Sequence, residues 1–105
     1  MGKTVVIMKQ TNLNGIVERS SALLEALSIQ SDMFYRGYNT DLETLQYSSG
    51  DFKIDVTIFC DSHIDQCEIV KYLKNHPAKH LGTISRGAVK PTGNYWVYYR
   101  IIIDL

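Results

Sequence analysis

The last quarter of the chain, residues 79–105 (KHLGTISRGAVKPTGNYWVYYRIIIDL), constrains the fold more than any other stretch because it is typical of one β-hairpin. Pro91 has a fixed φ that suits the second position of a turn, and Gly93 adopts a left-handed conformation at no steric cost. Lys90, Pro91, Thr92 and Gly93 therefore fit a type I turn followed by a bulge glycine, the usual three-residue hairpin loop.

This turn also predicts which residues face one another across the hairpin. Starting from Lys90 opposite Asn94, the facing pairs are Ala88 with Trp96, Arg86 with Tyr98, and Ile84 with Arg100. The other face receives a mainly apolar set, consisting of Leu81, Thr83, Val89, Val97, Tyr99, Ile101 and Ile103. Because successive side chains of a strand point to opposite faces, one face of the hairpin is apolar and the other is aromatic and cationic.

The size and composition of the chain indicate one domain. Its 105 residues fit a single α+β domain over residues 1–105 that folds without disulfides. A hydrophobic content of 45% and a charged content of 21% match those of soluble globular proteins. The longest apolar runs are too short to span a membrane, and the first residues lack a signal-peptide pattern. We therefore expect a cytoplasmic protein that does not enter a membrane.

The charges are separated along the chain although the net charge is zero. Residues 41–68 contain seven acids and one lysine, whereas residues 69–103 contain six bases and no acid. Blocks of opposite sign can steer a charged partner or join copies head to tail. They can equally neutralise one another across the fold, and the sequence leaves both interpretations open.

The first half of the chain predicts two strands around a helix. Residues 3–10 (KTVVIMKQ) fit a central strand with apolar side chains on both faces. Asn14 would cap a helix over residues 16–29, whose apolar stripe contains Ile16, Leu23 and Leu27, flanked by Val17 and Leu24. Residues 31–40 (SDMFYRGYNT) indicate an ordered loop or an extra edge strand, and residues 42–47 indicate a strand.

The stretch over residues 52–59 has the cleanest alternation in the chain and predicts a half-buried strand. One face would carry Phe52, Ile54, Val56 and Ile58, and the other Lys53, Asp55, Thr57 and Phe59. Ser62, with Asp65 three residues later, resembles a capping box that starts a second helix. The buried stripe of that helix would consist of Cys67, Val70 and Leu73, with Ile69 on its flank, and Pro77 would end it.

These elements give the order β-α-β-β-α-β-β. Two helices packed on one face of a mainly antiparallel sheet would bury both helical stripes. The order corresponds to a ferredoxin-like split βαβ arrangement with an added C-terminal strand.

No local motif commits the chain to a reaction, so we predict no catalytic residue, no metal site and no cofactor. Asp61, Ser62 and His63, followed by Asp65, have the residue types of a hydrolase triad, but neighbours at a helix start do not line up as one. Cys60, His63 and Cys67 lack the paired-ligand spacing of a structural zinc site, and both cysteines are better explained as reduced core residues. Gly2-Lys3-Thr4 (the ending of a phosphate-binding loop) lacks the strand and glycine that must precede it.

The remaining candidate is the outer face of the predicted sheet. Its aromatic and cationic residues are Lys53, Phe59, Arg86, Lys90, Trp96, Tyr98 and Arg100. Tryptophan, tyrosine and arginine are the residues that most often anchor protein interfaces. We therefore predict a non-enzymatic module that binds a protein partner, or a second copy of itself, through this face.

The face could instead be covered by a loop of the protein itself, such as residues 31–40, and would then bind nothing. Two further alternatives use the same residues for binding. Aromatic side chains among cations also suit single-stranded nucleic acid, although the glycine–aromatic signature and the basic charge of such proteins are missing. A small nuclease would need Arg86, Lys90 and Arg100 to hold a phosphate, with His76 or His80 as the nearest candidates for its general base.

Overall fold

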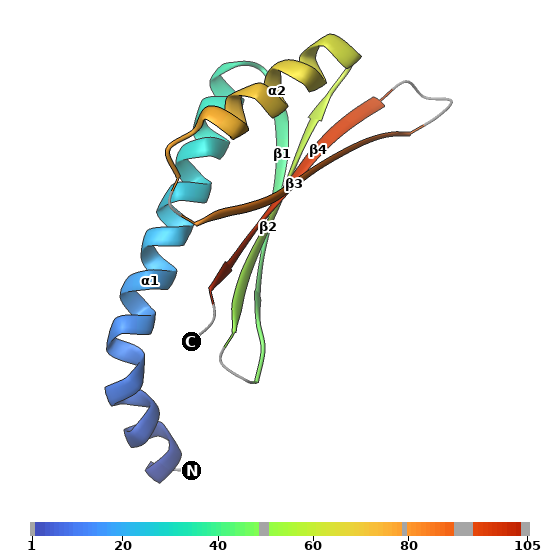
Figure 1. Ribbon diagram of the computed structural model, residues 1–105. Helices are drawn as coiled ribbons and strands as arrows, with labels where there is room; N and C mark the ends of the chain where they lie inside the picture. Colours follow the sequence, from blue (N-terminus) through green and yellow to red (C-terminus); the bar gives the residue numbers. More distant parts are fainter. Residues whose placement is uncertain (1, 49–50, 79, 90–93, 104–105) are drawn as a thin grey trace.

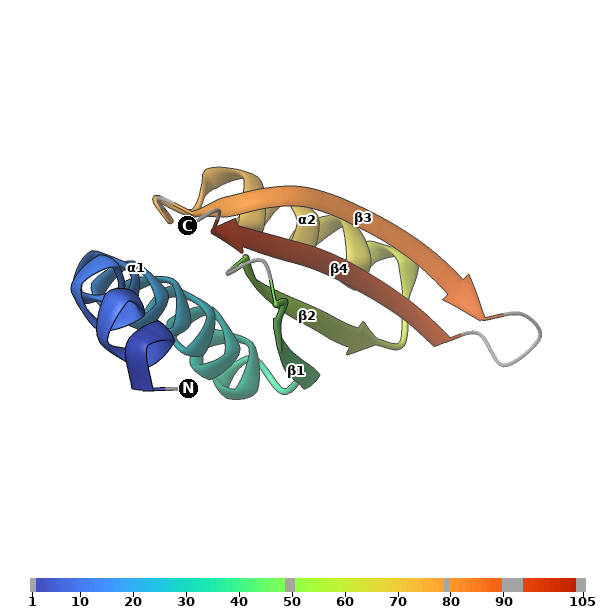
Figure 2. The same cartoon turned by 90° about the horizontal axis from the view of Figure 1, so that it is seen from below.

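The computed structural model describes residues 2–48, 51–78, 80–89 and 94–103, and within them every side chain except those of residues 2–16 and 89. The described elements are α1 (Gly2–Tyr35), β1 (Asn39–Gln46), β2 (Phe52–Cys60), α2 (His63–Asn75), β3 (Leu81–Val89) and β4 (Asn94–Ile103). The four strands form one antiparallel sheet in the order β1-β2-β4-β3. Both helices lie on the same face of this sheet, α1 across β1 and β2 and α2 across β3 and β4 (Figures 1 and 2).

The α+β class and the two helices on one face are confirmed, but the predicted order is wrong at its first element. Residues 3–10 belong to α1, so the order is α-β-β-α-β-β and the expected ferredoxin-like arrangement with an added strand does not form. A short apolar run does not by itself distinguish a strand from a helix. Asn14, expected to cap a helix, lies inside α1.

The buried stripe of α1 differs from the one expected. The sheet packs against Ala22, Ala26, Ile29 and Met33, all of which are fully buried. Small alanines at two of these positions let the helix approach the sheet closely. The larger Val17, Leu24 and Leu27 are exposed instead, and Leu23 packs against the core. The side chain of Ile16, the remaining member of the expected stripe, lies outside the described part of the chain.

A glycine sets the end of α1. Gly37 has a φ of 89°, in the left-handed region that favours glycine. Its N–H donates to the carbonyl of Phe34, and the N–H of Tyr38 donates to that of Met33, each at 2.9 Å. This pair of bonds is a Schellman motif, which satisfies the last carbonyls of a helix. The segment 31–40, expected to be a loop or an extra edge strand, therefore forms the end of α1, a turn and the beginning of β1.

Strand β2 confirms the expected alternation. Ile54, Val56 and Ile58 are fully buried beneath the helices, whereas Phe59 is 40% exposed on the other face. Strand β1 begins three residues earlier than expected and pairs with β2 along its whole length. In β4, the apolar row of the predicted hairpin (Val97, Tyr99, Ile101 and Ile103) is likewise buried on the helix-covered face.

Helix α2 begins as expected and buries part of the expected stripe: Leu73 and its flanking Ile69 are buried, and Val70 packs against the core. The Oγ atom of Ser62 accepts from the N–H of Asp65 at 3.1 Å, which satisfies one of the unpaired donors of the first turn. The buried residues are Gln66, Ile69 and Leu73. Cys67, expected in the core, is exposed, because the face of α2 that meets the sheet is centred one residue earlier.

The pairing of β3 with β4 differs from the expected register by one residue. Val89 pairs with Asn94, Gly87 with Trp96 and Arg86 with Val97, so four residues rather than three connect the strands. Those connecting residues, 90–93, which include the expected turn and Lys90, lie outside the described part of the chain.

The core explains this register. Leu81 and Ile84 are three residues apart, and a regular strand would point them to opposite faces. The irregularity between them turns both toward the core, where Leu81 faces Ile101 and Ile84 faces Tyr99. Arg86 consequently lies on the helix-covered side of the sheet rather than beside Tyr98.

Candidate functional site

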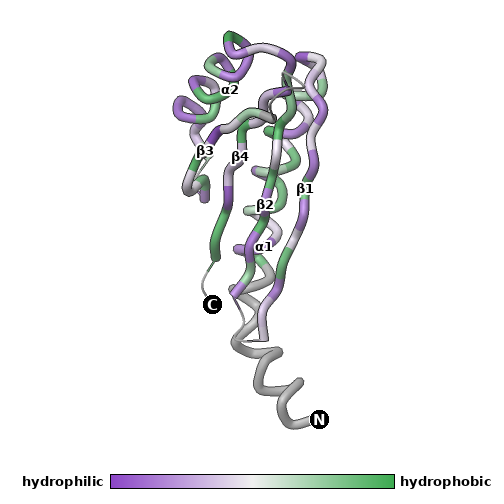
Figure 3. Tube along the Cα trace, turned by 90° about the vertical axis from the view of Figure 1, so that its right-hand side faces the viewer, coloured by the Kyte–Doolittle hydropathy of each residue, from purple (hydrophilic) through white to green (hydrophobic). Residues whose placement is uncertain are grey.

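The sheet face opposite the helices is the main candidate site, and we call it the open face. Figure 3 views the sheet from this side, and α1 runs behind β1 and β2 with no described helix or strand in front of them. The open face is formed by the outward side chains of all four strands. Its central residues are Asp55, Thr57, Phe59, Ser85, Trp96, Tyr98 and Arg100.

The centre of the open face is a shallow aromatic hollow of about 380 Å³. It is lined by Thr57, Phe59, Ser85, Trp96 and Tyr98. Cross-strand pairing places these side chains together, since Phe59 faces Trp96 and Thr57 faces Tyr98. Neighbouring side chains on one face of a sheet are the ones that interact.

A glycine in β3 holds the tryptophan of this hollow in place. Gly87 pairs with Trp96, and a Cβ atom added at Gly87 would lie only 2.2 Å from the Cζ2 atom of the indole ring. The indole therefore lies directly over the bare backbone of β3. Close approach of a ring to a strand is one reason for a glycine within a strand.

An ion pair borders the hollow on one side. The Nε and Nη2 atoms of Arg100 donate to the two carboxylate oxygens of Asp55 at 2.7 and 2.9 Å, and the Tyr98 hydroxyl donates to Oδ1 at 2.8 Å. The hydrogen bond from Arg100 lowers the pKa of Asp55 below its ordinary value, and the bond from Tyr98 adds to the effect. Burial, followed by the bond to Asp55, raises the pKa of Tyr98. Arg100 is thus held by a carboxylate of its own sheet.

Two further carboxylates lie on the β1 side of the open face. Asp41 faces Thr57 and Glu43 faces Asp55 across the strand pair, and both acids are exposed. The cation on this part of the face is Lys53, whose Nζ atom lies 4.8 Å from the ring centre of Tyr47. The charged border of the hollow is therefore mainly acidic on this side.

The structure brings together five of the seven residues predicted for the binding face. Lys53, Phe59, Trp96, Tyr98 and Arg100 share the open face. Arg86 lies on the opposite side, where its Nη1 atom is 3.9 Å from the sulfur of Cys67, and Lys90 is outside the described residues.

The open face contains residues that the sequence did not single out. Ser85 and Gly87 join it because of the register shift, which the turn residues did not predict. Asp41 and Glu43 flank Leu42, the first residue of the predicted strand, and a period of two with Leu42 facing inward places both acids on the outer face.

The residues of the nuclease alternative do not form one phosphate site. Arg86 and Arg100 lie on opposite faces of the sheet. The ring of His80 contacts Glu25 through Nδ1 at 3.0 Å and Glu18 through Nε2 at 2.8 Å, which places it against α1.

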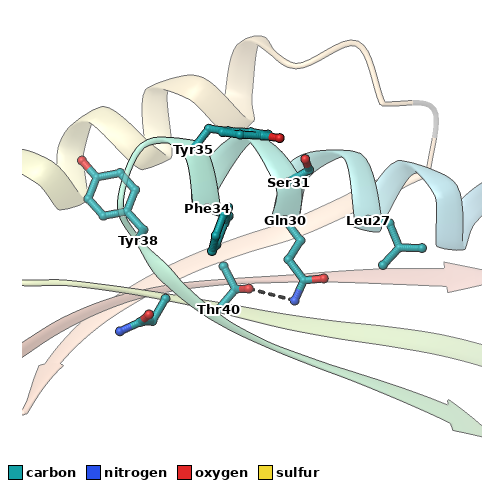
Figure 4. Close-up of a pocket in the computed structure, with 8 residues that line it drawn as sticks. Leu27, Gln30, Ser31, Phe34, Tyr35, Tyr38 and Thr40 are labelled. Atoms are coloured by element: carbon teal, nitrogen blue, oxygen red, sulfur yellow. Dashed lines mark hydrogen bonds between the residues drawn. The ribbon is translucent and has the colours of Figure 1, made fainter.

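A second hollow, of about 430 Å³, lies between the end of α1 and the start of β1 (Figure 4). Leu27, Ser31 and Phe34 line it from the helix, and the side chain of Gln30 donates to the Thr40 hydroxyl at 2.8 Å across its floor. The Gln30 amide nitrogen and the Thr40 hydroxyl oxygen are thus already hydrogen-bonded to each other. The second hollow therefore has fewer unused polar groups to orient a ligand than its lining suggests.

The described residues contain neither a metal-binding cluster nor a membrane-spanning helix. Within the described ranges, no three His, Cys, Asp or Glu side chains are grouped closely enough to hold a metal ion. None of the helices there is long and apolar enough to cross a membrane.

The chain was also compared with protein-family models, curated proteins and solved structures, and none of these comparisons returned a match. Function is therefore inferred from the geometry of the molecule itself.

Proposed function

We propose that this protein is a non-enzymatic binding module that engages a protein partner through its open face. The observation that carries the proposal is the aromatic hollow around Phe59, Trp96 and Tyr98, which lies on the sheet face away from both helices. The helix-covered face already supplies the core. A second aromatic row that the core does not use is typical of an interaction site.

The charges of the open face favour a protein over a nucleic acid. Three basic residues of the hairpin were expected to meet phosphates. Arg86 lies on the other face, Arg100 is paired with Asp55, and Lys90 is outside the described residues. Asp41 and Glu43 add negative charge on the β1 side. Nucleic-acid interfaces instead need a basic surface that neutralises phosphates.

The same charges suggest the chemistry of the partner. An aromatic hollow accepts an apolar or aromatic side chain, and the acids of β1 suit lysine or arginine nearby. A partner segment that presents one large apolar side chain next to basic residues would match both features.

The proposal is tested by affinity capture from an extract of the source cells with the purified protein as bait. Trp96→Ala is compared with Phe34→Ala, which removes an aromatic ring that is 72% exposed on α1, away from the open face. We expect Trp96→Ala to lose specifically captured proteins and Phe34→Ala to retain them. Equal capture by both variants, or capture of nucleic acid that disappears with Trp96→Ala, would contradict a protein-binding role for the open face.

The charge argument has its own test. The double variant Asp41→Asn, Glu43→Gln should weaken binding of the captured partner most strongly at low salt, because salt screens exposed charges. Light scattering of the purified protein separates a foreign partner from self-association. A dimer that Trp96→Ala dissolves would identify the partner as a second copy.

A further inference from the structure

A cysteine, a histidine, a glutamine and an arginine meet at the start of α2, outside the open face. The Sγ atom of Cys67 lies 3.5 Å from the Nε2 atom of His63, one helical turn earlier. The Nδ1 atom of the same ring lies 3.2 Å from the Oε1 atom of Gln66. A nucleophile, a base and a group that orients the base are the parts of an activated thiol.

The surroundings of Gln66 determine which of its atoms faces the histidine. Its side chain is 4% exposed, and its amide nitrogen donates to the carbonyls of Gly87 at 2.9 Å and Trp96 at 3.0 Å. Carbonyl oxygens only accept, so the amide nitrogen must point to them and Oε1 must point to His63.

This orientation determines the tautomer of His63. An amide oxygen accepts a hydrogen bond, so Nδ1 of His63 carries the proton and donates it to Gln66. The lone pair of the neutral ring is then on Nε2, which faces the sulfur of Cys67 at 3.5 Å. His63 is thus arranged to accept the thiol proton.

Arg86 places a positive charge beside the sulfur. Its Nη1 atom donates toward the Sγ atom of Cys67 at 3.9 Å from the neighbouring strand β3. The sulfur of Cys67 thus has contacts with both a guanidinium nitrogen and an imidazole nitrogen, and reactive cysteines in proteins are found beside groups of this kind. Cys67 is also exposed, so that a reagent can reach it.

The other cysteine provides a contrast within the same chain. Cys60 is 5% exposed, and its thiol donates to the carbonyl of Ser62 at 3.7 Å. Burial raises the pKa of Cys60, so its thiolate is disfavoured. The described structure therefore has one inert and one accessible thiol.

We propose that Cys67 is an activated thiol that undergoes thiol–disulfide exchange with small disulfides of the cell. The Cys67 proton moves to Nε2 of His63, and the thiolate attacks one sulfur of the incoming disulfide. The new S–S bond joins Cys67 to half of that molecule while its original S–S bond breaks. The other half leaves as a thiolate and takes the proton from His63, so Cys67 is oxidised and the departing half is reduced.

The test uses an aromatic disulfide that releases a coloured thiol, with stopped-flow detection. The Cys60→Ser variant leaves Cys67 as the single thiol. The reaction rate of the same variant in denaturant is the reference for a thiol without activation. We expect folded Cys67 to react about tenfold faster than the denatured thiol, and His63→Ala to remove that acceleration. His76→Ala, which changes a histidine at the far end of α2, should leave the rate unchanged. Reaction no faster than in denaturant, or an unchanged rate in His63→Ala, would overturn the proposal.

Whether Gln66 positions His63 can be tested in the wild-type protein, without a substitution at Gln66. Nuclear magnetic resonance of the imidazole nitrogens distinguishes the two neutral tautomers of His63. We expect the proton on Nδ1, and a proton on Nε2 would contradict the arrangement and the proposal with it. Oxidation of the protein with the same disulfide, followed by mass mapping, should place the adduct on Cys67, whereas an adduct on Cys60 alone would also overturn the proposal.

Discussion

The two faces of strand β2 share one backbone and differ in their surroundings. Ile54, Val56 and Ile58 are fully buried beneath the helices, whereas their neighbours Thr57 and Phe59 line a hollow on the other face. The covered face depends on close packing of apolar groups, which stabilises the fold. The open face carries aromatic and charged groups that this packing does not require. If the open face binds the partner as proposed, substitutions at neighbouring residues of β2 should change stability and binding separately.

The largest effect should come from the covered face. Val56→Ala and Ile58→Ala each remove fully buried atoms and leave a cavity. We expect each to lower the free energy of unfolding by about 2–4 kcal/mol, as is usual for large-to-small changes in a core. Chemical denaturation of the purified variants gives this value directly. A loss below that of the open-face variants would mean that β2 faces the other way.

The next effect should come from the glycine beneath the tryptophan. Gly87→Ala places a methyl group where the indole ring lies, so Trp96 must move. We expect a loss of about 1–3 kcal/mol in the free energy of unfolding, the usual range for overpacking. The fluorescence of Trp96, the single tryptophan of the chain, should change as well. Ser85→Ala, on the same strand and face, is the matched control and should leave the fluorescence as it is.

A smaller, pH-dependent effect is expected from Asp55. Its pKa in the folded protein is lower than the ordinary value of 3.8, so in acid the unfolded chain binds more protons at this residue than the folded protein does. The contribution of the ion pair is therefore complete above the ordinary pKa and is lost as the pH falls through the folded pKa. Thermal melts from neutral to acid pH should show wild type losing more stability below about pH 4 than Asp55→Asn does. Equal losses would mean that the ion pair does not contribute.

The smallest effects should come from Thr57→Ala and Lys53→Ala. Both side chains lie on the open face and remain partly exposed. We expect changes within about 0.5 kcal/mol in the free energy of unfolding, as for most surface substitutions. Chemical denaturation of these two variants, measured together with Val56→Ala from the inward face of β2, gives the difference in stability between the two faces.

The elements with strong local signals could be predicted from the sequence. The alternation in β2 predicted its buried face, and Ser62 predicted the start of α2. The aromatic row of β4 followed from the same period of two, which is why Trp96 and Tyr98 were predicted on the open face together. These signals depend on neighbouring residues alone.

The elements that depend on distant contacts could not be predicted in this way. Residues 3–10, with an apolar run at 5–8, fit a strand or a helix equally well until the rest of the sheet is known. The register of β3 depends on bringing both Leu81 and Ile84 to the core. This requires an irregularity in the strand that the turn residues do not predict. Gly37 did carry a usable signal, since a glycine after an apolar helical run commonly ends a helix.

The most direct test of the central claim compares Ile58→Ala with Phe59→Ala on the same samples, by denaturation and by partner capture. We expect Ile58→Ala to lose stability and still capture the partner at a temperature where it is folded. Phe59→Ala should have a free energy of unfolding close to that of wild type and should capture less of the partner. A Phe59→Ala protein that captures its partner as wild type does, while Ile58→Ala loses capture although folded, would contradict binding through the open face.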